Sequence, residues 1–183
     1  MAEVFYAPRA EKSLDFTARV LNTYYAQNDV RFFTSAHGKP YCDAPFRFSV
    51  SHTKRLIFLC VSRGEAGIDA EETRRGGTFG AIVKRLSPCE RALAETSRGA
   101  FLKLWTRREA TAKYLDLPVF SSFSRLVFQA ENGSAACAES LFPVYDGVAL
   151  PAELHTFELC GHFVSLCLTK GEPVREVRFI NGF

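Results

Sequence analysis

Strand-like segments that follow one another with no helix between them place the strongest limit on the fold of this chain. In "FRFSVSHTKRLIFLCVSRGEAGIDAEE", residues 46–51 alternate between apolar and polar side chains, residues 56–62 form an apolar run, and residues 67–71 alternate again. Short segments of this kind, bounded by turn residues, are typical of β-strands. We interpret residues 56–62 and 67–71 as a β-hairpin that turns at "RGEA".

Other strand patterns cluster in the same way. They are predicted at residues 3–6 (as an edge strand), 29–34, 124–129, 155–160, 162–169 and 174–180, with turns at "ENG" (131–133) and Gly161. Because the strands come in runs and do not alternate with helices, we expect an α+β fold with a mostly antiparallel sheet. The length of 183 residues suits one domain or two small fused halves.

Helical periodicity is found in three segments. Residues 13–27 carry apolar side chains at helical spacing (Leu14, Ala18, Leu21 and Tyr25), with Ser13 as the expected N-cap. Ser87, Pro88 and Glu90 form the pattern of a capping box at the start of a second helix. A third pattern covers residues 101–115, with Phe101, Leu104, Trp105, Ala112 and Leu115 on one side.

The composition is that of a globular protein with a sizeable core, since 47% of the residues are apolar and 17 are Phe. A net charge of +3 is too small to indicate a nucleic-acid-binding surface. The six cysteines include no CxxC pair, so neither a zinc site nor disulfides are expected. With no signal-peptide pattern and no apolar stretch long enough to span a membrane, we expect a cytoplasmic protein.

Two carboxylates stand out in "GIDAE". Asp69 and Glu71 are two residues apart on a predicted strand, so their side chains leave the same face, while Ile68 and Ala70 point into a core. Two carboxylates on one face repel each other unless a cation lies between them, and Mg²⁺ prefers such oxygen ligands. A solvated strand end is the simpler alternative for this pair taken alone.

A second candidate pair lies in "WTRREATAK". Glu109 and Lys113 are four residues apart on a predicted helix and therefore share one face, one turn after Trp105. They could supply a third carboxylate to a metal and an ammonium group to developing phosphate charge. An ordinary surface ion pair, and a Trp in the core, are the alternatives.

Three further residues could contact phosphate groups. Ser51 lies on the polar face of its strand, His52 begins the loop after it, and Lys39 belongs to the Gly/Pro-containing loop "HGKPY". Each of these side chains, taken singly, could equally be a solvated or structural group.

In their order along the chain, "DVRFFTSAHGKPY", "FRFSVSH", "GIDAEE" and "LWTRREATAK" resemble the successive motifs of the 4'-phosphopantetheinyl transferase superfamily. The resemblance covers residues 29–115 well and the C-terminal strands loosely. Trp105 and the DxE spacing are more similar to the Sfp-type branch than to the smaller trimeric holo-carrier-protein synthases.

The resemblance implies transfer of 4'-phosphopantetheine from coenzyme A to a serine of an apo acyl or peptidyl carrier protein, with release of 3',5'-ADP. It also implies two pseudo-symmetric α+β halves, expected at residues 1–83 and 84–183, with the site between them. A monomer follows by the same analogy, with coenzyme A and the carrier protein as partners and neither nucleic acid nor membrane.

The resemblance also implies a role for each candidate residue. Asp69, Glu71 and Glu109 would hold Mg²⁺ against the pyrophosphate of coenzyme A, and Glu109 would deprotonate the carrier serine directly or through water. Lys113 would neutralise the pyrophosphate, as both a catalytic and a coenzyme A-binding group. The remaining contacts to the coenzyme A phosphates would come from Lys39, Ser51 and His52.

The chain departs from the family pattern in three places, one of which is "SHTKR", where the family more usually has a turn of small residues after the histidine. The segment between the first strand and the first helix, which usually carries basic residues for the 3'-phosphate, is short, so Arg9, Lys12 and Arg19 are candidate substitutes. After the third helix, "KYLDLPV" stands where the family has a Gly-rich turn. Candidates for steering an acidic carrier protein are Lys84, Arg85, Arg107 and Arg108.

Two rival functions remain open. "IDAEET" superficially resembles the first motif of DnaQ-like exonucleases, although the further aspartates and the tyrosine of that class do not follow in the right order. A degenerate homologue that binds coenzyme A or a carrier protein without catalysis is the other alternative.

Overall fold

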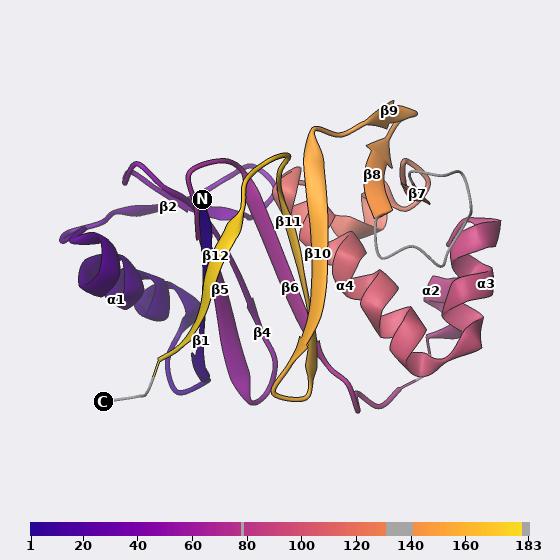
Figure 1. Ribbon diagram of the computed structural model, residues 1–183, viewed down its shortest axis with the longest axis horizontal. Coiled ribbons are helices and arrows are strands. Elements are labelled where there is room, and N and C mark those ends of the chain that lie inside the picture. The colour runs from indigo at the N-terminus through magenta and orange to yellow at the C-terminus, as the bar shows by residue number, and fades with distance from the viewer. Residues whose placement is uncertain (78, 131–140, 181–183) are drawn as a thin grey trace.

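The computed structural model describes residues 1–77, 79–130 and 141–180 and has the α+β architecture that the strand runs predict (Figure 1). Within these residues the helices are α1 (Ser13–Tyr25), α2 (Gly80–Val83), α3 (Pro88–Thr96) and α4 (Arg98–Tyr114), with a 3-10 turn, η1 (Val119–Ser122). The strands are β1 (Ala2–Pro8), β2 (Phe32–Thr34), β3 (Pro40–Cys42), β4 (Arg47–His52), β5 (Leu56–Ser62), β6 (Ala66–Glu72), β7 (Leu126–Ala130), β8 (Leu141–Tyr145), β9 (Val148–Ala149), β10 (Ala152–Leu159), β11 (His162–Thr169) and β12 (Val174–Phe179).

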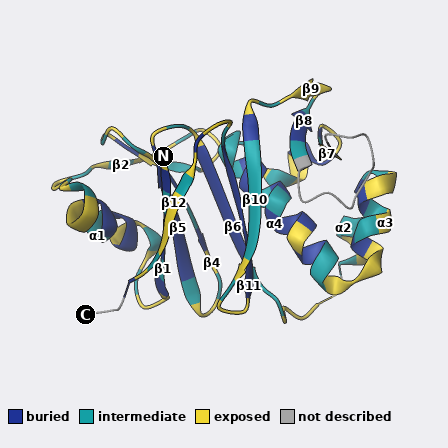
Figure 2. Ribbon diagram, viewed as in Figure 1, coloured by how far each residue is buried: buried dark blue, intermediate teal, exposed yellow. Residues whose placement is uncertain are grey.

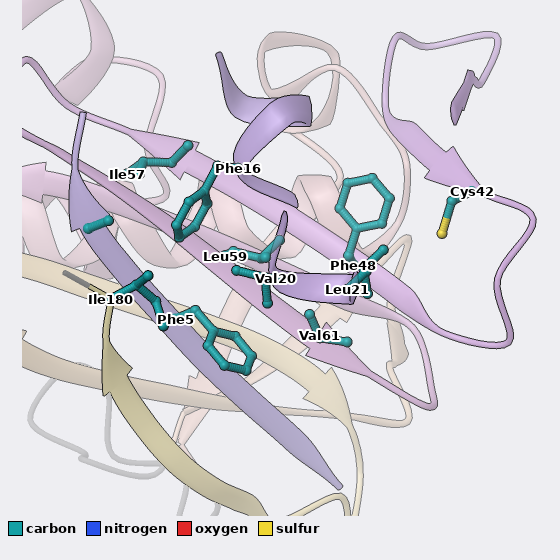
Figure 3. Close-up of a cluster of buried hydrophobic side chains, with 11 residues drawn as sticks. Phe5, Phe16, Val20, Leu21, Cys42, Phe48, Ile57, Leu59, Val61 and Ile180 are labelled. Carbon is teal, nitrogen blue, oxygen red and sulfur yellow. The ribbon is translucent and has the colours of Figure 1, made fainter. Parts of the chain in front are cut away.

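A four-stranded sheet forms the first layer, in the order β12-β1-β5-β4, with α1 packed against it. Figure 3 shows the cluster that joins them, in which Phe16 and Leu21 of α1 meet Phe5 and Leu59 of the sheet. The edge position expected for the first strand is wrong. The last strand, β12, pairs in parallel with β1 and covers that edge.

A three-stranded sheet in the order β10-β11-β6 forms the second layer, and α4 covers one of its faces (Figure 1). The hairpin β2–β3 and the sheet β7-β8-β9 are separate small units. The main sheets exchange strands across residue 83, because β6 pairs with β11 and β12 pairs with β1. The division of the chain into halves at that residue stays a prediction.

The predicted hairpin of residues 56–62 and 67–71 is also wrong. Both strands form, but β5 pairs with β1 and β4, whereas β6 pairs with β11. The other edge of β6 faces β4, and side chains satisfy its backbone there. The N–H groups of Ile68 and Ala70 donate to the hydroxyls of Ser49 and Ser51 at 3.0 and 3.2 Å. The two sheets therefore meet at a seam of side-chain hydrogen bonds, and Ser49 and Ser51 on the polar face of the β4 alternation are buried.

Close packing of α4 on β6 depends on Gly67. A Cβ atom at this position would lie 1.9 Å from the carbonyl oxygen of Ala110 and 2.7 Å from the amide nitrogen of Tyr114. Figure 2 shows β6 and β11 as largely buried, with α4 buried on the side that faces them. The glycine of "GIDAE" therefore lets the helix that carries Glu109 approach the strand that carries Asp69.

The helices start near the predicted positions. The capping box is confirmed, since the Ser87 hydroxyl accepts the N–H of Glu90 and the Glu90 carboxylate accepts the N–H of Ser87. Helix α4 begins earlier than predicted, at Arg98 after the N-cap Ser97. In α1, Ser13 is not the N-cap but the first helical residue.

The apolar stripe of α1 also differs from the prediction. The side chain of Leu14 is exposed, and the buried positions are Phe16, Thr17, Val20 and Leu21. The predicted turn at 131–133 lies outside the described residues. Among the described cysteines, all are free thiols. No helix in the described part of the chain combines the length and apolar character needed to cross a membrane.

Candidate functional site

A hollow of about 310 Å³ lies where the seam between β4 and β6 meets α4. Its lining combines the carboxylates, the hydroxyl, the imidazole and the ammonium group that the motifs predict. The lining residues are Ser13, Val50, Ser51, His52, Asp69, Glu71, Trp105, Glu109 and Lys113. Of the predicted site residues, only Lys39 is missing from this set.

Asp69 is the most buried carboxylate of the hollow, at 6% exposure. Its Oδ1 accepts hydrogen bonds from the Ser51 hydroxyl at 2.9 Å and from the Lys113 ammonium at 2.8 Å. Its Oδ2 is buried and has no hydrogen-bond partner. An unpartnered carboxylate oxygen in a buried position is costly, so this atom is suited to a further cation.

Lys113 reaches from the last turn of α4 into the seam. Besides Asp69, its Nζ donates to the backbone carbonyls of Ile68 at 2.9 Å and Val50 at 3.5 Å. The ammonium group thus joins α4 to both sheets at the point where they meet. The alternative of an ordinary surface ion pair between Lys113 and Glu109 is not what the structure has, since Lys113 forms a partly buried ion pair with Asp69.

Glu109 lies one turn before Lys113 and faces the same hollow. Burial raises the pKa of its carboxyl to about 7, with a further contribution from the negative charge of Asp69. A carboxyl that titrates near neutral pH exchanges protons easily, and a pKa perturbed by burial and a like charge is typical of functional sites.

Glu71 is held differently from the other two carboxylates. Its side chain forms an ion pair with Arg75, which follows the end of β6 and lies four residues further along the chain. In the part of the chain that the structure describes, no three His, Cys, Asp or Glu side chains are gathered closely enough to enclose a metal. The donor chemistry still fits a hard cation, because all the donors are oxygen atoms and Asp69 Oδ2 is unpartnered. The charge of Asp69 also adds to the burial that raises the pKa of Glu109.

His52 ends β4 at the rim of the hollow and is exposed. Partial desolvation of its ring, and then the positive charge of Arg9, lower its pKa from the usual value. The imidazole is therefore neutral at pH 7, with one N–H to donate to an anion. The neighbouring Thr53 is anchored by a hydrogen bond of 3.1 Å to the buried His162.

Lys39 lines a second hollow, of about 560 Å³, at the other end of β4. Its Nζ donates to the Ala66 carbonyl at 3.2 Å and to the Glu65 carboxylate at 3.3 Å. The carbonyls of Ala66 and Ile68 are two residues apart on β6, so the ammonium groups of Lys39 and Lys113 attach to neighbouring positions of one strand edge. The edge of β6 thus carries two ammonium groups, on the carbonyls of Ala66 and Ile68.

The candidate basic residues of the N-terminal segment are not gathered at the first hollow. The guanidinium of Arg9 donates to the backbone carbonyl of Thr53 at 3.1 Å, next to His52. Arg19 pairs with Glu11, and Lys12 is the N-cap residue of α1. Ser13, which was interpreted only as a cap, lines the hollow instead, and no sequence signal distinguished that role.

The proposed steering role of Arg108 is contradicted by its burial. Its side chain is 1% exposed and donates to both oxygens of Glu90 at 2.7 Å and to the Leu126 carbonyl at 2.9 Å. Arg107 is partly buried and donates to the Thr156 hydroxyl at 2.9 Å. Lys84 and Arg85 are exposed.

A family model described as the 4'-phosphopantetheinyl transferase superfamily matches residues 65–162, which is more than half of the chain. The chain therefore belongs to this superfamily. The matched segment contains Asp69, Glu71, Glu109 and Lys113 but begins after the "GKPY" and "VSH" motifs. No curated protein matches the chain.

Proposed function

We propose that this protein transfers 4'-phosphopantetheine from coenzyme A to a serine hydroxyl of an apo carrier protein. The observation that supports this most directly is one hollow containing a carboxyl with a pKa of about 7, a second carboxylate with an unpartnered oxygen, and a lysine. Phosphoryl transfer depends mainly on positioning the reactants and on neutralising charge. Carboxylates that can hold a metal ion, together with a lysine, can do both.

Asp69, Glu71 and Glu109 would hold Mg²⁺ in this site, since all three line the hollow. When bound, Mg²⁺ would neutralise the pyrophosphate of coenzyme A and favour the ionised form of the carboxyls. The unpartnered Oδ2 of Asp69 is the atom of this chain best placed to accept a cation.

Glu109 would take the proton of the carrier serine, directly or through water. The serine oxygen then attacks the phosphorus next to the pantetheine arm, the bond from that phosphorus to the bridging oxygen breaks, and 3',5'-ADP leaves. Lys113 would balance the negative charge on the leaving group. A base whose pKa lies near the working pH is well matched to this step.

Coenzyme A has phosphates at two places, and the chain offers cationic or hydrogen-bonding groups at both hollows. Ser51, His52 and Lys113 would serve the pyrophosphate in the first hollow. Lys39 would serve the nucleotide end in the second, which has an aromatic wall from Tyr41, Phe46, Phe48 and Tyr114. In this arrangement Lys39 would contact the phosphate at the nucleotide end of coenzyme A, and the first hollow would hold only the pyrophosphate.

An acidic carrier protein would approach the exposed basic surface beside Trp105. Arg85 lies over the rings of Phe120 and Phe123 at 6.0 and 5.0 Å, and Phe120 in turn lies 6.1 Å from Trp105 at the first hollow. Lys84 and Arg85 therefore remain the steering candidates. A cytoplasmic location, a monomeric state and the Sfp-type branch stay predictions.

Intact-mass measurement of apo carrier proteins tests the transfer. Carriers of the fatty-acid, polyketide and nonribosomal-peptide types are incubated with the protein, coenzyme A and Mg²⁺, and at least one should gain the mass of a phosphopantetheine group. Chelation of the metal should abolish the gain. Glu109→Gln should lower the rate by about 100-fold or more, whereas Glu95→Gln, at an exposed position of α3, should leave it unchanged.

If coenzyme A binds but none of these carriers is modified, the non-catalytic alternative replaces the proposal. An unchanged rate in Glu109→Gln would remove this residue from the role of base.

A further inference from the structure

Asp116 follows α4 at a backbone position where glycine is usual. The helix ends in a Schellman motif, in which the Asp116 N–H donates to the Lys113 carbonyl at 3.3 Å and the Leu117 N–H donates to the Ala112 carbonyl at 2.9 Å. Asp116 itself has a φ of +53°, in the left-handed region. Glycine would adopt this left-handed conformation with less strain than aspartate. An advantage of aspartate at this position must therefore come from the contacts of its side chain.

Those contacts cross to a remote part of the chain. The Ser35 hydroxyl donates to Asp116 Oδ1 at 2.8 Å, although 81 residues separate the two in sequence. The same hydroxyl accepts the backbone N–H groups of His37 and Lys39 at 3.3 and 3.0 Å. The His37 ring nitrogen Nδ1 lies 4.0 Å from the other oxygen of Asp116. One carboxylate therefore fixes the serine that organises the "SAHGK" loop.

The loop belongs to a unit that needs outside support. Strands β2 and β3 form a two-stranded sheet of their own, with Phe33 and Tyr41 exposed on it. A hairpin of two strands is marginally stable by itself. Its tip is attached on one side by Lys39, which reaches β6, and on the other by Ser35, which reaches Asp116 at the end of α4.

Both attachments border the second hollow, which Ser35, Lys39 and Asp116 line together. Lys113 lies three residues before Asp116, in the last turn of the same helix. The Ser35–Asp116 hydrogen bond consequently sets the place of the Lys39 loop relative to the helix end that carries Lys113.

We propose that Asp116 is a positioning residue for coenzyme A binding, because it holds the Lys39 loop at the distance from Lys113 that the two phosphate-bearing parts of the ligand require. This role rests on the proposed function, in which both lysines contact coenzyme A. Asp116 lines the second hollow, and in this role it acts through Ser35 and the loop and not on the reacting atoms.

The test uses two variants that separate the carboxylate from the backbone. Asp116→Gly removes the side chain but favours the left-handed backbone, so the melting temperature should not fall. Calorimetric titration should show affinity for coenzyme A and for 3',5'-ADP reduced by about tenfold, the order expected for one lost ordering hydrogen bond. Asp116→Asn keeps an acceptor for Ser35 and should bind both ligands nearly as the unaltered protein does.

A double-mutant cycle isolates the contact. Ser35→Ala should weaken coenzyme A binding by a similar factor, and Ser35→Ala combined with Asp116→Gly should weaken it no further than either change alone. Full affinity in Asp116→Gly would overturn the proposal, as would additive losses in the cycle, since both would show that the contact does not act on the ligand.

Amide hydrogen exchange without ligand keeps this test separate from that of the proposed function. Exchange at residues 35–39 should be faster in Asp116→Gly than in the unaltered protein or in Asp116→Asn. Equal exchange in all three would refute the tether itself. Failure of the unaltered protein to bind coenzyme A, with the exchange difference present, would refute the proposed function and the ligand role but leave the tether established.

Discussion

The two faces of α4 differ in how their charged side chains are paired. Arg108 and Glu109, which are neighbours in sequence, lie on these two faces. Arg108 points into the protein, is 1% exposed and pairs with Glu90, whose two oxygens both accept from it. Its guanidinium carries unpartnered Nε and Nη1 atoms, but lies 5.0 and 5.7 Å from the rings of Phe123 and Phe128. Glu109, the next residue, faces the first hollow beside Asp69.

The charged groups that point to a function are those whose charge is not balanced by a partner. On the Arg108 face, opposite charges are matched and enclosed, so the pair ties α3, α4 and β7 together. On the Glu109 face, three carboxylates and one lysine line the hollow, and one oxygen of Asp69 is unpartnered. Burial, and then the negative charge of Asp69, raise the pKa of Glu109. A buried ion pair whose charges balance has a structural role. Carboxylates without a balancing cation, gathered in a hollow, are suited to bind a cation and to transfer a proton.

The largest effect on stability is expected on the matched face. Arg108→Met leaves the Glu90 carboxylate buried without its partner, and should lower the free energy of unfolding by about 3–5 kcal/mol. Glu90→Gln added to this variant removes the orphaned charge while keeping the capping box, and should recover most of the loss. Urea unfolding measures both. A loss below about 1 kcal/mol in Arg108→Met would contradict the structural role of the pair.

A smaller, pH-dependent effect is expected on the unmatched face. Because the pKa of Glu109 is raised in the folded state to about 7, its protonated form stabilises the fold at low pH. This contribution is complete below the unfolded pKa of about 4.5 and is lost as pH rises through about 7, by at most about 3 kcal/mol.

The matched comparison for this prediction is Glu109→Gln, which cannot ionise. Between pH 5 and pH 8, the unfolding free energy of the unaltered protein should fall relative to that of the variant, as measured by urea unfolding without added metal. Parallel pH profiles for the two proteins would show that the carboxyl titrates normally.

Local patterns in the sequence predicted those features of the site that depend on residue spacing within one strand or helix. The i, i+2 relation of Asp69 and Glu71 and the i, i+4 relation of Glu109 and Lys113 do bring these side chains to one hollow. The capping box at Ser87 is likewise a local rule that the structure confirms. The roles of the gathered residues stay predictions.

Relations between distant segments were beyond those patterns. In place of the predicted hairpin, β6 lies beside β4, where the hydroxyls of Ser49 and Ser51 accept the backbone N–H groups of β6. Sequence periodicity does not reveal side-chain hydrogen bonds of this kind to a strand edge. Burial of Arg108 depends on Glu90, which lies on another helix. The tie between Ser35 and Asp116 joins two loops, and nothing in either loop sequence specifies the other.

The role of the Glu109 face in metal binding is tested by asking whether bound Mg²⁺ displaces a proton from Glu109. Mg²⁺ is titrated calorimetrically at pH 7 into the protein saturated with coenzyme A, in two buffers of different ionisation enthalpy. With a carboxyl of pKa about 7 among the ligands, about half a proton per Mg²⁺ should be released beyond that released by Glu109→Gln under the same conditions. Equal proton release by the two proteins would contradict the claim that the first hollow, lined by Glu109 of α4, is the active site. Mg²⁺ binding that is unchanged in Glu109→Gln would contradict it as well.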